Sequence, residues 1–278
     1  MIMTQEQLSD YKDYLIEEEK SSATLEKYLR DVKAFFVWTS KREVTKSIIL
    51  QYKEYLTENY APASVNSMLS SLNSFFEHTN LHELKVKMLK IQKKIFSVKE
   101  KELTKREYEK LLKAAKHGKN QKLYYLMQTI CASGIRVSEL KSITVEAVKA
   151  RKAIIRCKGK MRVIILPKEL CKMLIKYAHS KNISSGSIFI TKNGNPLDRS
   201  AIWKMMKRLC EHAGVPKQKV FPHNLRHLFA RTYYSIQKDI VRLADILGHS
   251  SINTTRIYTM ETGEIHRKQI QQLGLLKI

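Results

Sequence analysis

Four separated segments of the chain carry polar side chains of the kinds that act on phosphate esters. They are Ser133–Leu140, the residues around Gly159, His223–His227 and Leu247–Tyr258. Their candidate side chains are Arg136, Glu139, Lys158, His223, Arg226, His249 and Tyr258. Cleavage of a phosphodiester without a metal ion would need such arginines, a lysine, histidines, a carboxylate and a phenol. Each segment is a weak signal alone, and their combination favours phosphoryl transfer.

The arginines and histidines are suited to holding a phosphate. A phosphorane-like transition state gathers negative charge on its non-bridging oxygens, which paired guanidinium hydrogen bonds stabilise. Arg136 stands between Ile135 and Val137 at an expected helix start, where anions bind well; an ordinary salt-bridged arginine is the alternative. His223 and Arg226 are three residues apart on a helix and share a face, so they could converge on one phosphate.

A nucleophile and a general acid complete this chemistry. Tyr258 is the candidate nucleophile, because a phenol, with a pKa of about 10 in water, becomes more reactive beside cations. Lys158 is the candidate general acid, because a lysine on a hairpin tip can reach a DNA groove and protonate a departing 5′ oxygen. Lys160 lies on the same tip and is the alternative acid. Tyr233 and Tyr234 lie within an expected helix, and we interpret them as packing aromatics.

A metal site is the weaker interpretation of the histidines. His223 and His227 have the spacing of a metal-binding pair, but no glutamate follows His223 directly and no third ligand is evident. The cysteines include no Cys-x-x-Cys pair, so we expect buried thiols and neither a zinc ribbon nor structural disulfides. They are Cys131, Cys157, Cys171 and Cys210. We therefore expect neither a metal nor a cofactor.

The charge of the chain points to a polyanionic partner. Its 278 residues carry 51 lysines and arginines against 26 acidic residues, a net charge of +25, and the pI is about 9.8. This excess goes far beyond what solubility requires, and nucleic acid is the leading candidate. Residues 1–80 sum to −3 and residues 101–278 to +24, so the positive field belongs to the carboxy-terminal part. A ribosome-associated or merely cationic protein is the alternative.

The length and hydrophobic pattern predict two helix-rich domains. Residues 4–80 have apolar positions at helical spacing and predict four helices, with expected starts at Thr4, Ser22, Thr45 and Ala63. Pro62 stands where a first helical turn tolerates it. We place this first domain at residues 1–82 and a basic linker at residues 83–103. The linker's lysine-rich part, from Leu84 to Lys101, is either an amphipathic helix or a segment that follows a phosphate backbone.

The second domain, residues 104–278, is expected to open with a capping box of Thr104 and Glu107. Two β-rich runs, Ala153–Arg156 and Arg162–Leu166, predict a hairpin with its tip at Gly159, and Ser187–Thr191 is a further strand signal. Further helices are expected over residues 121–132, 137–142, 167–178, 200–213, 223–236, 240–247, 252–258 and 264–273. The fold class is therefore mainly α with a small β-sheet.

The sequence contains no signal for membrane insertion or export. No apolar run approaches the roughly 18 residues that span a bilayer, and the amino terminus lacks a basic flank before an apolar stretch. We expect a cytoplasmic protein without a membrane partner.

The order of these residues resembles the tyrosine recombinase (phage integrase) family. The pattern is Arg, Glu three residues later, a hairpin Lys, His-x-x-Arg-His, Leu-Gly-His and then Tyr. The resemblance covers nearly the whole chain and is strongest to short, two-domain Xer-type or transposon-encoded recombinases. It implies a helical, SAM-like core-binding domain and a mixed α+β catalytic domain that ends in a C-terminal exchange helix.

The resemblance also implies roles for single residues. The catalytic set would be Arg136, Lys158, His223, Arg226 and His249, with Tyr258 as the nucleophile and Glu139 as an accessory acid. Lys158 is preferred to Lys160 because the family places the general acid before the glycine. Lys160, Arg162 and Arg256 are the candidate DNA-binding residues. No metal or cofactor is implied.

The implied activity is site-specific recombination of double-stranded DNA through a 3′-phosphotyrosyl intermediate and a Holliday junction. The expected assembly is a homotetramer on two DNA sites, or a hetero-tetramer with a second recombinase; chromosome partition and transposition are among the family's tasks. The residues after Tyr258 would dock on a neighbouring protomer, with folding back on their own domain as the alternative. A type IB topoisomerase-like enzyme and a non-catalytic DNA-binding protein are the rival functions.

Overall fold

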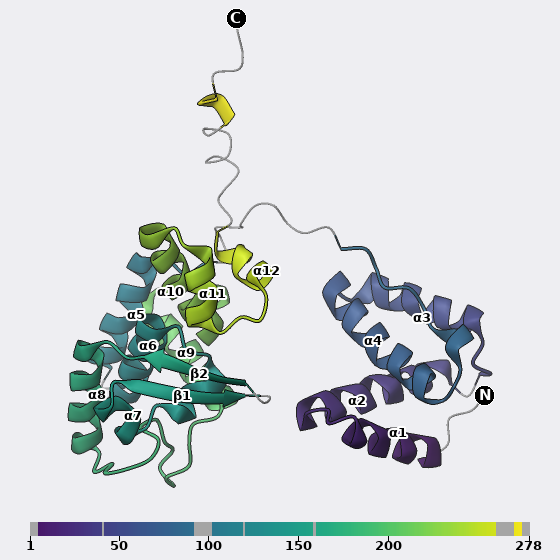
Figure 1. Ribbon diagram of the computed structural model, residues 1–278, viewed down its shortest axis with the longest axis horizontal. Helices are drawn as coiled ribbons and strands as arrows, with labels where there is room; N and C mark the ends of the chain where they lie inside the picture. The colour runs from purple at the N-terminus through teal and green to yellow at the C-terminus, as the bar shows by residue number, and fades with distance from the viewer. Residues whose placement is uncertain are drawn as a thin grey trace, which may run out of the picture. The chain divides into compact units, whose positions relative to one another are not determined.

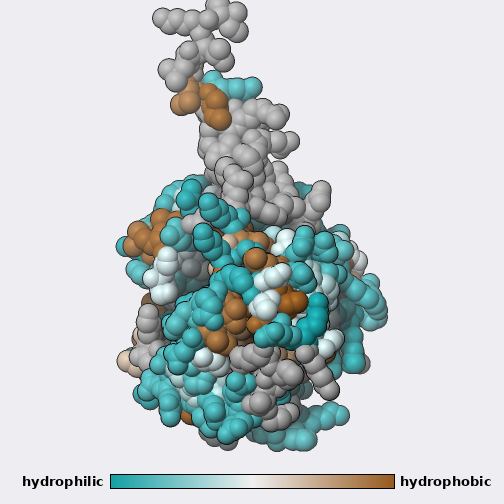
Figure 2. Space-filling view, turned by 90° about the vertical axis from the view of Figure 1, so that its right-hand side faces the viewer, coloured by the Kyte–Doolittle hydropathy of each residue, from teal (hydrophilic) through white to brown (hydrophobic). Residues whose placement is uncertain are grey.

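The computed structural model describes residues 5–40, 42–91, 102–118, 120–157, 160–259 and 270–273. The chain forms two compact units, Met1–Lys93 and Lys94–Ile278, both built mainly from helices (Figure 1). Within the described part, no helix is long and apolar enough to cross a membrane. The face in Figure 2 is mostly hydrophilic, with hydrophobic side chains gathered near its centre.

The first unit contains the four predicted helices. They are α1 (Gln5–Glu17), α2 (Ser22–Thr39), α3 (Lys46–Asn59) and α4 (Pro62–His78), followed by the 3₁₀ turn η1 (His82–Leu84). The Ser21 side chain accepts a hydrogen bond from the Thr24 amide, and Thr45 caps α3 in the same way. Pro62 is the first residue of α4, where its missing N–H costs nothing. The predicted start at Thr4 lies outside the described residues.

Residues 85–91 do not form a free linker. They run extended along α4, where two asparagines hold them through paired amide hydrogen bonds. Asn73 Oδ1 accepts from the Val86 N–H at 2.9 Å and Asn73 Nδ2 donates to the Val86 carbonyl at 2.8 Å. Asn66 makes the same pair with Leu89, at 2.7 and 2.9 Å. This part of the predicted basic linker is therefore anchored to the first unit and is not helical; residues 92–101 lie outside the described part.

The second unit has the predicted helices in nearly the predicted places. Its first elements are α5 (Lys105–His117), α6 (Gln121–Ser133), η3 (Val137–Ser142) and α7 (Val145–Lys149). The later helices are α8 (Lys168–Ser180), α9 (Arg199–Ala213), η4 (Lys217–Lys219), α10 (Pro222–Gln237), α11 (Ile240–Leu247), α12 (Ile252–Thr255) and η5 (Arg256–Tyr258). The predicted capping box is confirmed, since Thr104 and Glu107 exchange hydrogen bonds at the start of α5. The predicted helix over residues 264–273 lies mostly outside the described residues.

The predicted hairpin is confirmed as a two-stranded antiparallel sheet of β1 (Lys152–Cys157) and β2 (Lys160–Ile165). Ile155 pairs with Arg162, and these two residues belong to the face that packs on the core. Ile154 pairs with Val163 on the opposite face, where both are about half exposed. Lys158 and Gly159, between the two strands, lie outside the described residues.

The predicted strand Ser187–Thr191 is wrong. Ser187 and Ile190 each form one isolated bridge, to Thr144 and Pro196 respectively. The segment is apolar because Ile188 and Phe189 are buried in the core. It follows Gly186, which has φ +72°, and turns back so that the Thr191 amide donates to the Asn195 carbonyl, so no continuous ladder can form.

The core of the second unit gathers around α6. Leu126, Met127 and Ile130 on this helix are fully buried among apolar side chains of α5, α8, α9 and α10. A smaller cluster of Ala230, Leu243, Leu247 and Tyr258 joins α10, α11 and η5. These two clusters fix the C-terminal end of α6 against α10 and α11, which is where the candidate site lies.

Candidate active site

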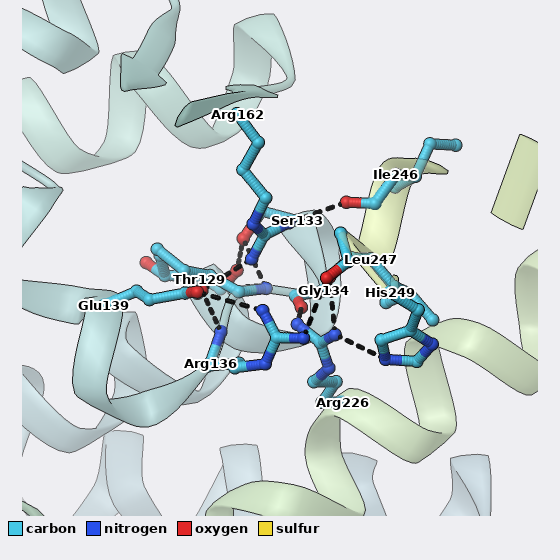
Figure 3. Close-up of polar contacts among 12 residues, drawn as sticks. Thr129, Ser133, Gly134, Arg136, Glu139, Arg162, Arg226, Ile246, Leu247 and His249 are labelled. Atoms are coloured by element: carbon cyan, nitrogen blue, oxygen red, sulfur yellow. Dashed lines mark hydrogen bonds and ion pairs between the residues drawn. The ribbon is translucent and has the colours of Figure 1, made fainter. Parts of the chain in front are cut away.

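The end of α6, strand β2, helix α10 and the turn after α11 meet at one polar cluster (Figure 3). Arg136 lies just after α6, Arg226 lies on α10 and His249 follows α11. The structure therefore brings together side chains that are up to 113 positions apart in the chain. Tyr258 and His223 border the same cluster.

Arg226 is the buried centre of this cluster. It is 2% exposed, its Nη1 donates to the Gly134 carbonyl at 2.5 Å, and its Nη2 donates to the Leu247 carbonyl at 2.7 Å. Burial, followed by the charge of Arg136, lowers the pKa of Arg226 to about 10. The guanidinium still carries its charge at neutral pH, and its position is fixed by backbone atoms from two separate segments.

Gly134 permits this arrangement. It has φ +64°, a conformation that glycine adopts at little cost, and it closes α6 as the C-cap. A Cβ atom at this position would lie 2.5 Å from the Phe229 ring. Only a glycine therefore lets the chain turn sharply between α6 and Arg136 while the Gly134 carbonyl points at Arg226.

Glu139 connects two further arginines. Its Oε1 lies 3.1 Å from Arg136 Nη1, and its Oε2 accepts from the Arg136 backbone N–H at 2.9 Å. Arg162 Nη2 lies 2.6 Å from Glu139 Oε2. Arg136 also donates from Nη2 to the Gly248 carbonyl at 3.1 Å, and its side chain is 39% exposed. One buried carboxylate thus orients a solvent-accessible guanidinium that can still receive a ligand.

His249 is held as a neutral imidazole. Its Nε2 lies 3.0 Å from Arg226 Nη2, and its Nδ1 lies 2.8 Å from Thr255 Oγ1. Burial, and then the charges of Arg226 and Arg136, lower the pKa of His249 to about 4. Arginine can only donate, so Nε2 is the acceptor and the proton of the neutral ring is on Nδ1, which donates to Thr255.

Tyr258 lies between two histidine rings. It is 4% exposed and packs on Leu243 and Leu247. Its ring centroid is 6.0 Å from that of His249, with nearly parallel planes, and 4.7 Å from that of His227, edge to face. The Tyr258 phenol also partly offsets the lowering of the Arg226 pKa that burial causes. The candidate nucleophile therefore stands beside the buried guanidinium.

His223 and His227 extend the cluster along α10. Their ring centroids are 4.4 Å apart. Burial, and then the charge of Arg226, lower the pKa of His223, while burial lowers the pKa of His227 to about 4. His227 Nε2 is buried and has no hydrogen-bond partner among the described residues. Both rings are neutral at pH 7 in this environment.

The other predicted residues have different surroundings. Lys158 lies outside the described part, and Lys160 begins β2 without a described side chain. Arg256 is exposed on η5. Arg162 was predicted to bind DNA, but its guanidinium contacts Glu139 and the Ile246 carbonyl inside the protein. Tyr233 and Tyr234 pack against the small cluster, in agreement with their interpretation as packing aromatics.

Sequence reasoning missed several members of the cluster. Thr255 is fully buried and its Oγ1 contacts His249 Nδ1, but the sequence gives no local signal for this role. The backbone carbonyls of Gly134, Leu247 and Gly248 accept hydrogen bonds in the cluster, and no side-chain type in the sequence predicts this. The two glycines do indicate the turns that end α6 and α11. The contact between Arg162 and Ile246 spans 84 positions and leaves no local pattern.

Comparison with known families and proteins shows which proteins the chain is similar to. Residues 101–264 match the phage integrase family, and residues 8–79 match the phage integrase N-terminal SAM-like domain. The tyrosine recombinase XerH of Campylobacter jejuni is 39% identical over 140 residues, which are 48% of this chain and 40% of that protein. The tyrosine recombinase XerA of Pyrococcus furiosus is 27% identical over 280 residues, which are 98% of this chain and 95% of that protein.

The fold is also shared with a solved structure. A lambda integrase tetramer bound to a Holliday junction has a TM-score of 0.71 and 20% identity, covering 91% of this chain and 76% of that one. The family match to residues 101–264 covers more than half of the chain, and a second match covers its amino-terminal helices. The chain therefore belongs to the phage integrase family.

Proposed function

We propose that the chain is a tyrosine site-specific recombinase that cleaves and rejoins duplex DNA. The observation that carries this proposal is the placement of Tyr258 beside the buried Arg226 guanidinium, with His249 between the arginine and Thr255. A phenol, two arginines and neutral imidazoles around one point are suited to phosphoryl transfer. The relatives named as tyrosine recombinases support the same activity.

Arg136 and Arg226 bind the non-bridging oxygens of the scissile phosphate. Arg226 is fixed by backbone carbonyls and Arg136 by Glu139, so neither guanidinium has to reorganise when negative charge develops. His223 is neutral before DNA binds, and its ring N–H can donate one hydrogen bond to a phosphate oxygen. Both ring nitrogens of His249 are already engaged, by Arg226 and Thr255, so in this state His249 helps to fix the Arg226 guanidinium.

Each cleavage is a transesterification. The Tyr258 oxygen attacks phosphorus and releases its proton to water, the bond from phosphorus to the 5′ oxygen breaks, and the 3′ end remains joined to Tyr258. The departing 5′ oxygen takes a proton from Lys158 and leaves as a free hydroxyl. Attack by a 5′ hydroxyl from a second duplex reverses these steps and produces a Holliday junction. The ester conserves the bond energy, so this chemistry consumes neither ATP nor another cofactor.

The partner is a double-stranded recombination site, bound by a tetramer on two sites. The lambda integrase tetramer on a Holliday junction has the same fold and supports this assembly. The tetramer contains four copies of this chain, or this chain and a second recombinase. We place the core-binding domain at residues 1–82, the basic linker at residues 83–103 and the catalytic domain, with its exchange helix, at residues 104–278. Because the substrate is DNA, we place the protein in the cytoplasm.

A suicide substrate tests this proposal. In a nicked duplex, the short fragment that carries the new 5′ hydroxyl diffuses away after cleavage, so the reaction cannot reverse. The wild-type protein should be trapped as a covalent adduct, while Tyr258→Phe should bind the site and form none. If Tyr258→Phe still forms an adduct, another tyrosine is the nucleophile. Strand exchange between two intact sites should then occur; relaxation of supercoils without exchange would favour a topoisomerase, and absence of any adduct would favour a DNA-binding protein.

A further inference from the structure

Arg162 lies inside the candidate site and not on the surface of the hairpin. It belongs to β2, and its side chain is 16% exposed. Its Nη2 lies 2.6 Å from Glu139 Oε2, and its Nη1 donates to the Ile246 carbonyl at 2.8 Å (Figure 3). One side chain therefore joins strand β2 to two segments that hold the catalytic candidates.

Gly248 leaves room for this side chain. It has φ +62°, and a Cβ atom there would lie 2.3 Å from Arg162 Cδ and 2.7 Å from Nε. The Gly248 carbonyl accepts from Arg136 Nη2 at 3.1 Å, and the next residue is His249. The aliphatic part of Arg162 thus lies against the turn that carries both the Arg136 acceptor and His249.

A role in DNA binding would break these contacts. Glu139 is only 7% exposed, and removing Arg162 from it would leave part of the carboxylate charge uncompensated inside the protein. Arg162 Nε is buried without a hydrogen-bond partner among the described residues, so this nitrogen does not face solvent. The observed position therefore fits an internal contact better than a contact with a phosphate outside.

We propose that Arg162 is a positioning residue that fixes the β1–β2 hairpin to Glu139 and to the turn of residues 246–249. This inference rests on the proposed function. In the sequence, Lys158 stands four positions before Arg162, so the Arg162 contacts hold the strand that follows the candidate general acid. Loss of Arg162 should therefore impair protonation of the leaving oxygen more than it impairs DNA binding.

The experiment compares Arg162→Gln and Arg162→Lys with a matched control, Arg156→Gln. Arg156 is on the same hairpin but belongs to the opposite, exposed face, so it loses the same charge without the internal contacts. Single-turnover adduct formation is measured at saturating protein on two nicked substrates, one with the natural 5′ oxygen and one with sulfur in its place. Sulfur is a better leaving group and needs little help from an acid.

The expected result for Arg162→Gln is a loss of roughly 100-fold on the oxygen substrate, as for an impaired general acid, with recovery to within about 5-fold of wild type on the sulfur substrate. DNA affinity should remain within about 2-fold of wild type. Arg162→Lys should be intermediate, because an ammonium cannot contact Glu139 and Ile246 with a rigid fork. Arg156→Gln should cleave both substrates at the wild-type rate.

Three results would overturn the proposal. Weaker DNA binding with an unchanged saturating rate would make Arg162 a DNA ligand. An equal loss on both substrates would remove the link to the general acid. If Arg162→Gln behaves like the wild type in every assay, Arg162 has no positioning role.

Hydrogen exchange of the DNA-free protein separates this inference from the proposed function. Arg162→Gln, unlike Arg156→Gln, should increase amide exchange in residues 160–165 and 246–249 and leave α6 unchanged. If the wild type forms no adduct but exchange changes as described, the proposed activity is wrong and the positioning role of Arg162 is supported. If amide exchange changes in neither segment, or changes equally in both segments and in α6, the proposed positioning role of Arg162 is wrong even in an active enzyme.

Discussion

Arg226 and His249 are joined by a contact of 3.0 Å between Nη2 and Nε2, and this contact determines which form of the imidazole is present. A protonated ring would bring a hydrogen on Nε2 against an obligate donor and add a positive charge to a cluster of arginines. The neutral Nδ1–H form avoids both penalties. A bound phosphate would supply the negative charge that the cluster lacks.

Acid should therefore destabilise the free protein. The pKa of His249 and that of His227 are about 4 in the folded protein and about 6.5 in an unfolded chain. Between these values the unfolded state binds more protons, so the free energy of unfolding should fall as the pH decreases from about 6.5 to about 4. Thermal melts across this range should show a smaller decrease for His227→Phe than for wild type.

An exposed histidine provides the control for this pH effect. His117→Gln should follow the wild-type pH profile, because His117 is exposed at the end of α5. A His227→Phe profile that coincides with that of wild type would contradict the assignment of a depressed pKa in the folded state.

Thr255 should affect catalysis through the orientation of His249. Thr255→Val has nearly the same shape but lacks the oxygen that accepts from Nδ1, so the ring loses the contact that fixes its tautomer. We expect adduct formation to slow by about 10-fold or more, with unchanged DNA affinity, and Thr255→Ser to recover most of the rate. Thr254→Val is the matched control, because Thr254 is exposed. A pH–rate profile identical to that of wild type would argue against this role.

Gly134 should be essential for both packing and conformation. Gly134→Ala combines a left-handed backbone with a Cβ atom 2.5 Å from Phe229, and we expect a loss of about 2–4 kcal/mol in the free energy of unfolding. Gly194→Ala separates the two effects, because Gly194 also has a positive φ but no atom within 4 Å of its Cβ position. Its cost should be about 1–2 kcal/mol. Equal losses in urea denaturation would show that the contact with Phe229 is unimportant.

The elements that the sequence predicts best are those with local signals. The starts of α3 and α5 were predicted from Thr45 and from the Thr104 and Glu107 pair, because a cap is satisfied within one helical turn. The run Ser187–Thr191 failed because apolar residues fit a buried irregular segment as well as a strand. The apolar pattern of residues 187–191 predicts that the segment is buried, but it does not predict which backbone groups form hydrogen bonds.

The candidate site could be predicted as a set of residues but not as a network. Arg136, Arg226 and His249 were found because their motifs are compact. The inward direction of Arg162 depends on Gly248 and on a carbonyl far along the chain, so the sequence shows only a basic residue beside a hairpin tip. DNA binding by Arg162 stays a prediction, and the positioning role is our proposal. A charge in sequence does not reveal whether its partner is a phosphate or a buried carboxylate.

The asparagine pairs that hold residues 85–91 should control the effective length of the connection between the two units. Asn73→Leu removes both hydrogen bonds to Val86 without a large change in volume, and we expect amide exchange of this segment to increase by about 10-fold, equivalent to about 1.4 kcal/mol. Asn73→Asp keeps the acceptor for the Val86 N–H and should retain most of the protection. Asn59→Ala is the control, because the Asn59 side-chain amide donates to the Tyr55 carbonyl of its own helix and not to residues 85–91.

The double variant Asn66→Leu with Asn73→Leu tests the functional consequence. A released segment lengthens the connection and lowers the effective concentration of one DNA-binding unit near the other, so affinity for a full site should decrease by several-fold. The catalytic unit is untouched, so the adduct rate on saturated DNA should stay at the wild-type value. An affinity equal to that of Asn59→Ala, despite faster exchange of residues 85–91, would show that this anchoring has no part in how the two units bind DNA together.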